Sequence, residues 1–155
     1  MRVAVARAFA ADRDVTAAFD AAVEVIRANG HQVSDSPERF AMPPFGDVRS
    51  IEADRRTIAR GPFETVDVLL LPTTTTTVPT VEDARADAQK LSAANTLFAN
   101  YFGLPAVSVP CGFDRHGLPI GLQLVAKAGD DGQVLQLAHQ YQIAAGLPRR
   151  HPPLA

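Results

Sequence analysis

The chain has 155 residues, 46% hydrophobic and 21% charged, with a formal net charge of −2 at pH 7. These values predict one folded domain over residues 1–155 and exclude a largely disordered chain. The balanced charge argues against a nucleic-acid partner, and the longest apolar run, residues 68–71, is too short to cross a membrane.

The first part of the chain predicts a β-α-β unit. Val3 and Val5 alternate with smaller or polar residues, as in a short strand. Apolar residues then recur at helical spacing, namely Val15, Phe19, Ala22, Val23 and Ile26. Asp12 or Asp14 is placed to cap this helix, Asn29 and Gly30 end it, and a return strand begins at His31. Because a helix connects the two strands, we expect them to be parallel.

The middle of the chain predicts a loop, a polar helix and a central strand. Residues 36–48 are rich in proline, so we expect a loop there. Residues 50–60 have the composition of a polar helix that ends at Gly61 and Pro62. Residues 66–71 are apolar on both faces, which is typical of a central strand. Pro72 stops that strand before a run of five threonines.

Residues 82–145 predict a long helix, a hairpin and a last helix. The long helix covers residues 82–102 and carries Leu91, Leu97 and Phe98 on its apolar face. Strands at 106–109 and 120–125 form an antiparallel hairpin with residues 114–117 at its tip. Residues 131–145 have the pattern of an amphipathic helix, with Val134, Leu135, Leu137, Ala138, Tyr141 and Gln142 on one face. The strands supply the expected core positions Val68, Leu70, Val107, Val109, Leu122 and Leu124.

Residues 100–125 read NYFGLPAVSVPCGFDRHGLPIGLQLV. The order N-x-x-G-L-P, S-V-P-C-G-F and G-L-P-x-G-L-Q closely resembles the C-terminal signature of the amidase signature family, serine amidohydrolases that cleave carboxamides. The resemblance implies an α/β fold with a mixed sheet flanked by helices. It also implies that residues 1–155 correspond to the C-terminal third of such an enzyme.

The catalytic residues of that family find no counterpart in this chain. The family uses two serines from a Gly/Ser-rich stretch and a lysine general base, which must be neutral to accept a proton. None of the serines here, Ser34, Ser36, Ser50, Ser92 and Ser108, lies in such a stretch. Lys90 and Lys127 lack the local pattern of the family lysine. We therefore expect no catalytic residue and no amidase activity from this chain alone, which leaves its status as an enzyme open.

The resemblance implies five substrate-binding candidates. Pro72, Thr73 and Thr74 correspond to a segment that enters the substrate cleft of family members. The alternative is a polar turn whose hydroxyls bond to their own backbone. Thr96 and Asn100 match the family's T-x-x-x-N, although for Asn100 a hydrogen-bonding role in fixing the turn is favoured over contact with substrate.

Other reactive side chains predict no further site. The four histidines lack metal-ligand spacing, so neither a metal nor another cofactor is expected. A pairing of Cys111 with His116 competes with a buried, inert thiol, which the sequence favours. A single cysteine and a strand-like start without a signal peptide predict a cytoplasmic location. Ala93 stands where glutamine-using members of the family carry an acidic residue, which favours a simple amidohydrolase lineage.

Three functions remain open from the sequence. In the first, the chain is the C-terminal part of an amidase, and a complementary core chain supplies the catalytic residues. The substrate of that amidase would be a small-molecule amide. Alternatively, it is a stand-alone non-catalytic binding or structural domain, or a truncated gene product. A missing core would leave apolar surface uncovered, so we expect binding to that core or self-association. The residues expected at that surface are Phe40, Met42, Phe45 and Phe63, together with the rims of the strand at residues 66–71.

Overall fold

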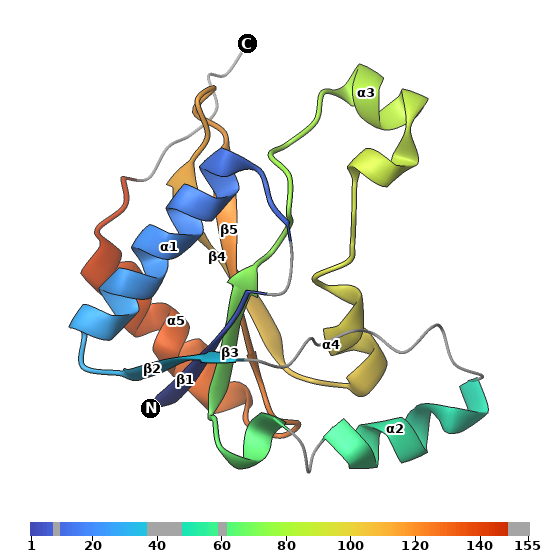
Figure 1. Ribbon diagram of the computed structural model, residues 1–155, viewed down its shortest axis with the longest axis vertical. Coiled ribbons are helices and arrows are strands. Elements are labelled where there is room, and N and C mark those ends of the chain that lie inside the picture. The colour runs from blue at the N-terminus through green and yellow to red at the C-terminus, as the bar shows by residue number, and fades with distance from the viewer. Residues whose placement is uncertain (8–9, 37–47, 59–61, 149–155) are drawn as a thin grey trace.

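The computed structural model describes residues 1–7, 10–36, 48–58 and 62–148. Five strands form one mixed sheet in the order β2-β1-β3-β5-β4 (Figure 1). The strands are β1 (Arg2–Ala6), β2 (Gln32–Ser36), β3 (Val68–Pro72), β4 (Ala106–Phe113) and β5 (Pro119–Ala126). β1 is parallel to β2 and β3, whereas β5 is antiparallel to β3 and β4. The predicted mixed sheet is therefore confirmed, and β3 begins and ends slightly later than predicted.

The first β-α-β unit forms as predicted. Helix α1 (Arg13–Ala28) joins the parallel strands β1 and β2 and buries all five of the apolar residues expected on its inner face. Asp12 is the residue before the helix, but its side chain does not cap it. Its carboxylate instead accepts a hydrogen bond from the backbone N–H of Thr77 at 3.1 Å. Asp12 therefore ties α1 to the segment after β3, which the local sequence could not show.

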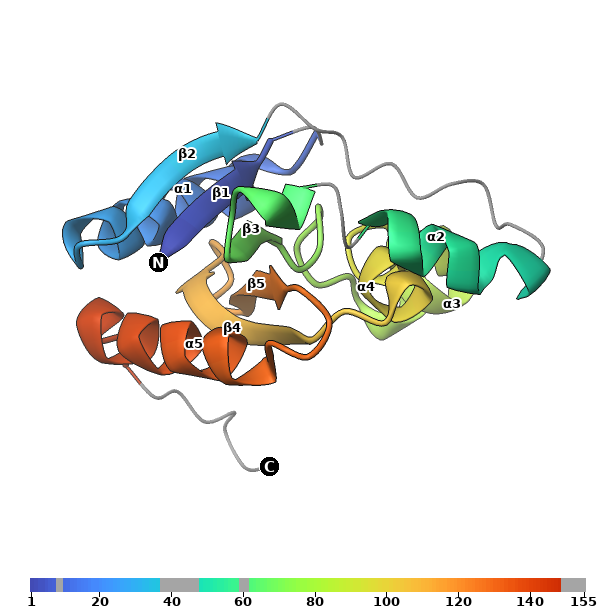
Figure 2. The same ribbon diagram turned by 90° about the horizontal axis from the view of Figure 1, so that it is seen from below.

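Helices α1 and α5 (Asp131–Ala145) cover one face of the sheet, as both ribbon views show (Figures 1 and 2). The bounds of α5 match the prediction. Val134, Leu137, Ala138 and Tyr141 are buried against the sheet. Leu135 is 63% exposed and Gln142 is also exposed, so the prediction that places both on the inner face is wrong. They lie one residue beyond the buried stripe, where the helix has already turned toward solvent.

The other face of the sheet is covered by short elements. These are α2 (Ile51–Ile58), the 3₁₀ turn η2 (Pro62–Glu64) and α4 (Leu97–Phe102), with a further 3₁₀ turn, η1 (Val48–Ser50), before α2. The core on this face contains Ala4, Ala6, Phe63, Leu69, Leu71, Phe98, Ala99, Phe102, Leu104 and Val125. Phe63 is only 6% exposed, so its predicted position at an uncovered surface is wrong. Phe40, Met42 and Phe45, and most of the loop predicted at 36–48, lie outside the described residues.

The long helix predicted over residues 82–102 is broken into three pieces. They are α3 (Val81–Ala86), the 3₁₀ turn η3 (Ala88–Lys90) and α4. Asp87 causes the first break, because its backbone is extended and its side chain accepts a hydrogen bond from the N–H of Gln89. Leu91 consequently leaves the predicted apolar face and is 63% exposed.

The hairpin strands are longer than predicted and the link between them is shorter. β4 continues through Pro110 because it is an edge strand, where a missing backbone N–H costs no ladder bond, and its register shifts between Pro110 and Gly112. The tip is closed by Asp114, whose carboxylate accepts the N–H groups of His116 and Leu118, each at 2.8 Å.

Five of the six predicted core positions are confirmed as buried, and the sixth is not. Val68, Leu70, Val109, Leu122 and Leu124 are each at most 6% exposed. Val107 is only half-buried, since it lies on the edge strand at the rim of the core. Among the described residues, no helix is both long and apolar enough to span a membrane, and no group of three or more acidic, His or Cys side chains could hold a metal ion.

Candidate pocket wall at the end of strand β3

Two hydroxyl groups from neighbouring parts of the sheet meet beyond the end of β3. The Oγ1 atom of Thr73 lies 2.6 Å from the Oγ atom of Ser108 on β4. The backbone N–H of Thr73 donates to the carbonyl of Gly121 on β5 at 2.8 Å, which fixes the residue against the sheet. Ser108 is exposed and Thr73 is half-buried, so the pair forms a polar spot at the surface.

Gly121 makes this pairing of hydroxyls possible. It lies on β5, which separates β3 from β4, and it faces Pro110 across the hairpin. A Cβ atom at this position would lie 2.6 Å from Thr73 Oγ1 and 2.8 Å from Ser108 Oγ. A glycine within a strand often marks such a close approach. The glycine therefore provides the space in which the side chain of Thr73, just after β3, meets that of Ser108 on β4.

An amide network extends the polar spot along the same face of the sheet. The side-chain N–H of Asn95 donates to the carbonyl of Pro72 at 2.8 Å. Gln123, which is 4% exposed, donates from Nε2 to the carbonyl of Asn95 at 2.6 Å. Gln123 pairs with Leu71 on β3 and with Ser108 on β4, so it joins the two sides of the spot.

The predicted site residues separate into two groups. Pro72 and Thr73 belong to the polar spot, whereas the hydroxyl of exposed Thr74 donates to the carbonyl of Thr76 at 2.9 Å. Thr96 donates its hydroxyl to the carbonyl of Ala93 at 3.1 Å. Asn100 is exposed on α4, and its carbonyl accepts the N–H of Gly103 at 3.3 Å. Thr74 thus bonds to the local backbone, as in the alternative that the sequence left open for the threonine run, and Thr96 also bonds to a nearby carbonyl.

A separate clamp holds the end of α4, where Asn100 lies. Arg55 on α2 donates from Nε to the carbonyl of Tyr101 at 2.9 Å and from its terminal nitrogen to that of Asn100 at 3.5 Å. The Tyr101 hydroxyl donates to the Asp54 carboxylate at 2.6 Å, and this bond raises the pKa of Tyr101. An arginine at the carboxyl end of a helix stabilises its unpaired carbonyls. The clamp therefore fixes the position of Asn100 at the end of α4.

Sequence reasoning misses three members of the polar spot, namely Asn95, Ser108 and Gln123. The strand pattern places Ser108 and Gln123 without assigning them a role, although each is a polar residue on an otherwise apolar strand. Gln123 interrupts the apolar run of β5 at a position shared with Gly121 and Val125 on one face. A polar residue in a buried strand needs a hydrogen-bonding partner, and that requirement is the signal available in the sequence.

The polar spot contains only uncharged groups. They are hydroxyls, amides and backbone carbonyls, which can exchange hydrogen bonds with another neutral polar group. The two lysines are elsewhere: Lys127 is exposed, and Lys90 is exposed and ion-paired with Asp83 at 2.7 Å. Burial raises the pKa of the Cys111 thiol to about 12, so this buried residue is protonated near neutral pH.

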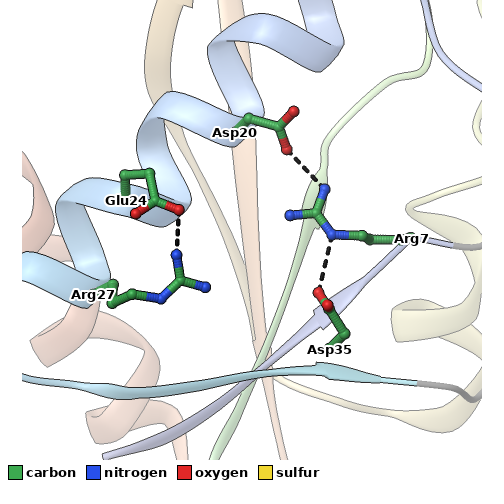
Figure 3. A network of polar contacts seen from close by, with 5 residues as sticks. All are labelled: Arg7, Asp20, Glu24, Arg27 and Asp35. Carbon is green, nitrogen blue, oxygen red and sulfur yellow. Dashed lines mark hydrogen bonds and ion pairs between the residues drawn. The ribbon is translucent and has the colours of Figure 1, made fainter.

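A charged network lies at the ends of β1 and β2 (Figure 3). Arg7 contacts Asp20 on α1 at 2.7 Å and Asp35 on β2 at 2.9 Å, and these hydrogen bonds raise its pKa. Glu24 and Arg27 form a neighbouring ion pair within α1. All of these side chains are substantially exposed, so the network adds little stability and links α1 to the sheet.

Comparison with known proteins assigns the family. The family model described as Amidase matches residues 47–135, which include the polar spot and the hairpin. The chain therefore belongs to the amidase family, as the signature at residues 100–125 implied. The A subunit of the glutamyl-tRNA(Gln) amidotransferase of Prochlorococcus marinus (strain MIT 9303) is 48% identical over 93 residues, which make up 58% of this chain and 19% of that protein. Its counterpart in Brevibacillus brevis is 46% identical over 92 residues, which make up 58% of this chain and 19% of that protein.

Solved structures share the fold. The structure of 6-aminohexanoate cyclic dimer hydrolase has a TM-score of 0.79 and 22% identity, and the likeness covers 99% of this chain and 47% of that one. The glutamyl-tRNA(Gln) amidotransferase A subunit from Thermotoga maritima has a TM-score of 0.72 and 22% identity, with 92% and 42% covered. The chain thus spans about a fifth of the curated relatives named above and less than half of these structures.

Proposed function

We propose that this chain is the C-terminal segment of an amidase-signature hydrolase, folded as one domain over residues 1–155. In this proposal it supplies part of the core and one wall of a carboxamide pocket, while a complementary core chain supplies the two serines and the lysine. One observation carries the proposal: almost the whole chain superimposes on 6-aminohexanoate cyclic dimer hydrolase, yet it accounts for only 47% of that structure.

The polar spot is the proposed pocket wall. A carboxamide offers one carbonyl acceptor and two N–H donors, and the Thr73–Ser108 hydroxyl pair can both donate and accept. Pro72 positions that pair through its carbonyl bond to Asn95, and the Arg55 clamp positions Asn100. Thr74, Thr96 and Asn100 remain proposed contacts on the strength of the family motif. The predicted lineage based on Ala93 also stays a prediction.

Reconstitution tests the proposal. The amidotransferase A subunit of P. marinus MIT 9303, shortened to remove the counterpart of this chain, is co-expressed with the tagged chain. Ammonia release is then measured with a panel of aliphatic and aromatic carboxamides. We expect no turnover from the chain alone, because it lacks an activated nucleophile and a base, and turnover from the co-purified pair. Turnover by the chain alone that Ser108→Ala abolishes, or tight carboxamide binding without any core, would instead favour a self-sufficient domain.

A further inference from the structure

Residues 78–91, termed the arm, form an excursion from the body of the protein. The arm contains α3 and η3, and neither has a buried residue. Its apolar side chains are turned to solvent, with exposed fractions of 54% for Val78, 62% for Val81 and 63% for Leu91. Figure 1 shows α3 standing apart from the sheet, joined by one extended segment to β3 and by another, after η3, to α4.

Contacts within the arm are too weak to account for its helical form. A six-residue helix without tertiary packing is unstable in water. Thr80 caps α3 by accepting the N–H of Asp83 at 3.1 Å, and Lys90 pairs with Asp83 at 2.7 Å. Both contacts are exposed, and exposed ion pairs contribute little. A surface that covers the three apolar side chains would supply the missing stabilisation.

The segments on either side of the arm lead to the polar spot. Before the arm, Thr73 bonds to Ser108, and after it, Asn95 bonds to the Pro72 carbonyl. The chain is therefore anchored to the proposed pocket wall a few residues before and after the arm. A protein that covers the arm would be held beside that wall.

We propose that the arm is the docking surface for the catalytic core of an amidase-signature protein, with Val78, Val81 and Leu91 as its apolar contacts. This inference rests on the proposed function. The family match at residues 47–135 includes the whole arm, and the related hydrolase structure has more than half of its chain outside the superimposed part. We assign the counterpart of that additional part as the binding partner of the arm.

A second exposed apolar pair supplies a matched control. Leu135 and Ile143 on α5 are 63% and 69% exposed, which is comparable to the arm residues. They differ in that α5 is already packed through Val134, Leu137 and Tyr141 against the face of the sheet covered by α1 and α5. In the arm, α3 and η3 bury no residue, so the arm lacks the packed face that α5 has.

The test compares three tagged proteins, each co-expressed with the shortened P. marinus protein: the parent chain, Val78→Ser/Val81→Ser/Leu91→Ser, and Leu135→Ser/Ile143→Ser. We expect the parent and the α5 variant to retain equal amounts of the core on the affinity column. The arm variant is expected to retain about a tenth of that amount or less, as for loss of several central apolar contacts. Thermal melting of the variants without the core should match the parent, because none of the replaced side chains is buried.

Each other outcome contradicts a different statement. Equal retention by all three proteins would overturn the role of the arm and leave the proposed function standing. No retention by the parent would overturn the proposed function and the docking proposal together. Self-association of the parent that only the arm variant loses, measured by sedimentation velocity, would assign the arm to a second copy instead. A lowered melting temperature of the arm variant alone would show that the arm packs on its own chain.

Discussion

Leu70 lies at the centre of the sheet on β3, with none of its surface exposed, and belongs to the core beneath α1 and α5. Leu70→Ala should lower the free energy of unfolding by about 2–5 kcal/mol, because it removes buried methyl groups and leaves a cavity. Urea denaturation measures this change. Leu135→Ala, at a side chain that is 63% exposed, is the matched control and should change stability by less than about 0.5 kcal/mol. Identical denaturation midpoints for the two variants would contradict the assignment of the core.

Gly121 and Thr73 should behave as a coupled pair. Gly121→Ala places a methyl group 2.6 Å from Thr73 Oγ1, so the hydroxyl pair must move and stability should fall by about 1–3 kcal/mol. In a Thr73→Ala background the nearest atom is gone, and the same substitution should cost less. A double-mutant cycle by chemical denaturation measures the difference, which is expected to be at least about 0.5 kcal/mol. Simple additivity would show that the hydroxyl is not the obstacle.

Asp67 is expected to make the stability of the folded protein depend on pH in the acidic range. Its carboxylate accepts hydrogen bonds from the Arg2 guanidinium at 2.7 and 3.2 Å and from the Arg2 backbone N–H at 2.7 Å. These bonds lower the pKa of Asp67 below its ordinary value of 3.8. As the pH falls, Asp67 is therefore protonated in the unfolded chain at a higher pH than in the folded protein. The stabilisation by these hydrogen bonds is fully present above the unfolded pKa and is lost as the pH falls through the folded pKa. Asp67→Asn should be less stable than the parent at pH 7 and lose less stability on acidification, as followed by thermal melting.

At the scale of elements, periodic burial decides which predictions succeed. Helix α1 and helix α5 are predictable with their bounds because each packs a continuous stripe, such as Val15, Phe19 and Ile26, onto the sheet. The break in the helix predicted at 82–102 cannot be anticipated from composition, since residues 82–91 are rich in good helix formers. Propensity alone favours a helix there, whereas no packed face exists to hold one together.

The sequence predicts the site residues at the end of β3, but not those that the other strands contribute. The family motif leads to Pro72 and Thr73, and both lie in the polar spot. Ser108 and Gln123 come from the hairpin and reach the same spot through strand pairing. Their part in it depends on the order β3-β5-β4, which no local pattern reveals. Asn95 escapes prediction for a related reason, because the sequence favours placing it inside a helix.

Replacing the helical part of the arm, residues 80–90, should leave the fold intact. Substituting residues 80–90 by a Gly-Ser linker of equal length removes α3 and η3, which bury no side chain. The contacts of Asp12 with the segment around Thr77 and of Asn95 with Pro72 remain in place. We expect the free energy of unfolding to change by less than about 1 kcal/mol, as for surface changes. Circular dichroism with urea measures it, and a large loss of stability would show that the arm supports the core.

At the scale of the molecule, the two faces of the sheet are covered unequally. α1 and α5 pack along the full first face, whereas short elements cover the second. On that second face the edge strand β4 exposes Ala106, Ser108 and Pro110. The polar spot, with Ser108 and Gln123, lies on this less covered side. In the proposed complex, this side is where the core of an amidase would be accommodated.

The position of β3 in the sheet has a consequence for the order of folding. β1-α1-β2 and the hairpin with α5 are each built from contacts close in sequence, so each can begin to form by itself. β3 joins them, because it pairs Val3 with Val68 on one side and Val68 with Ala126 on the other. Both pairings close long stretches of chain, and contacts between distant residues form slowly. We therefore expect β3 to pair with its neighbours only after β1-α1-β2 and the hairpin with α5 have begun to form. It does so although it lies between these two parts in space and in sequence.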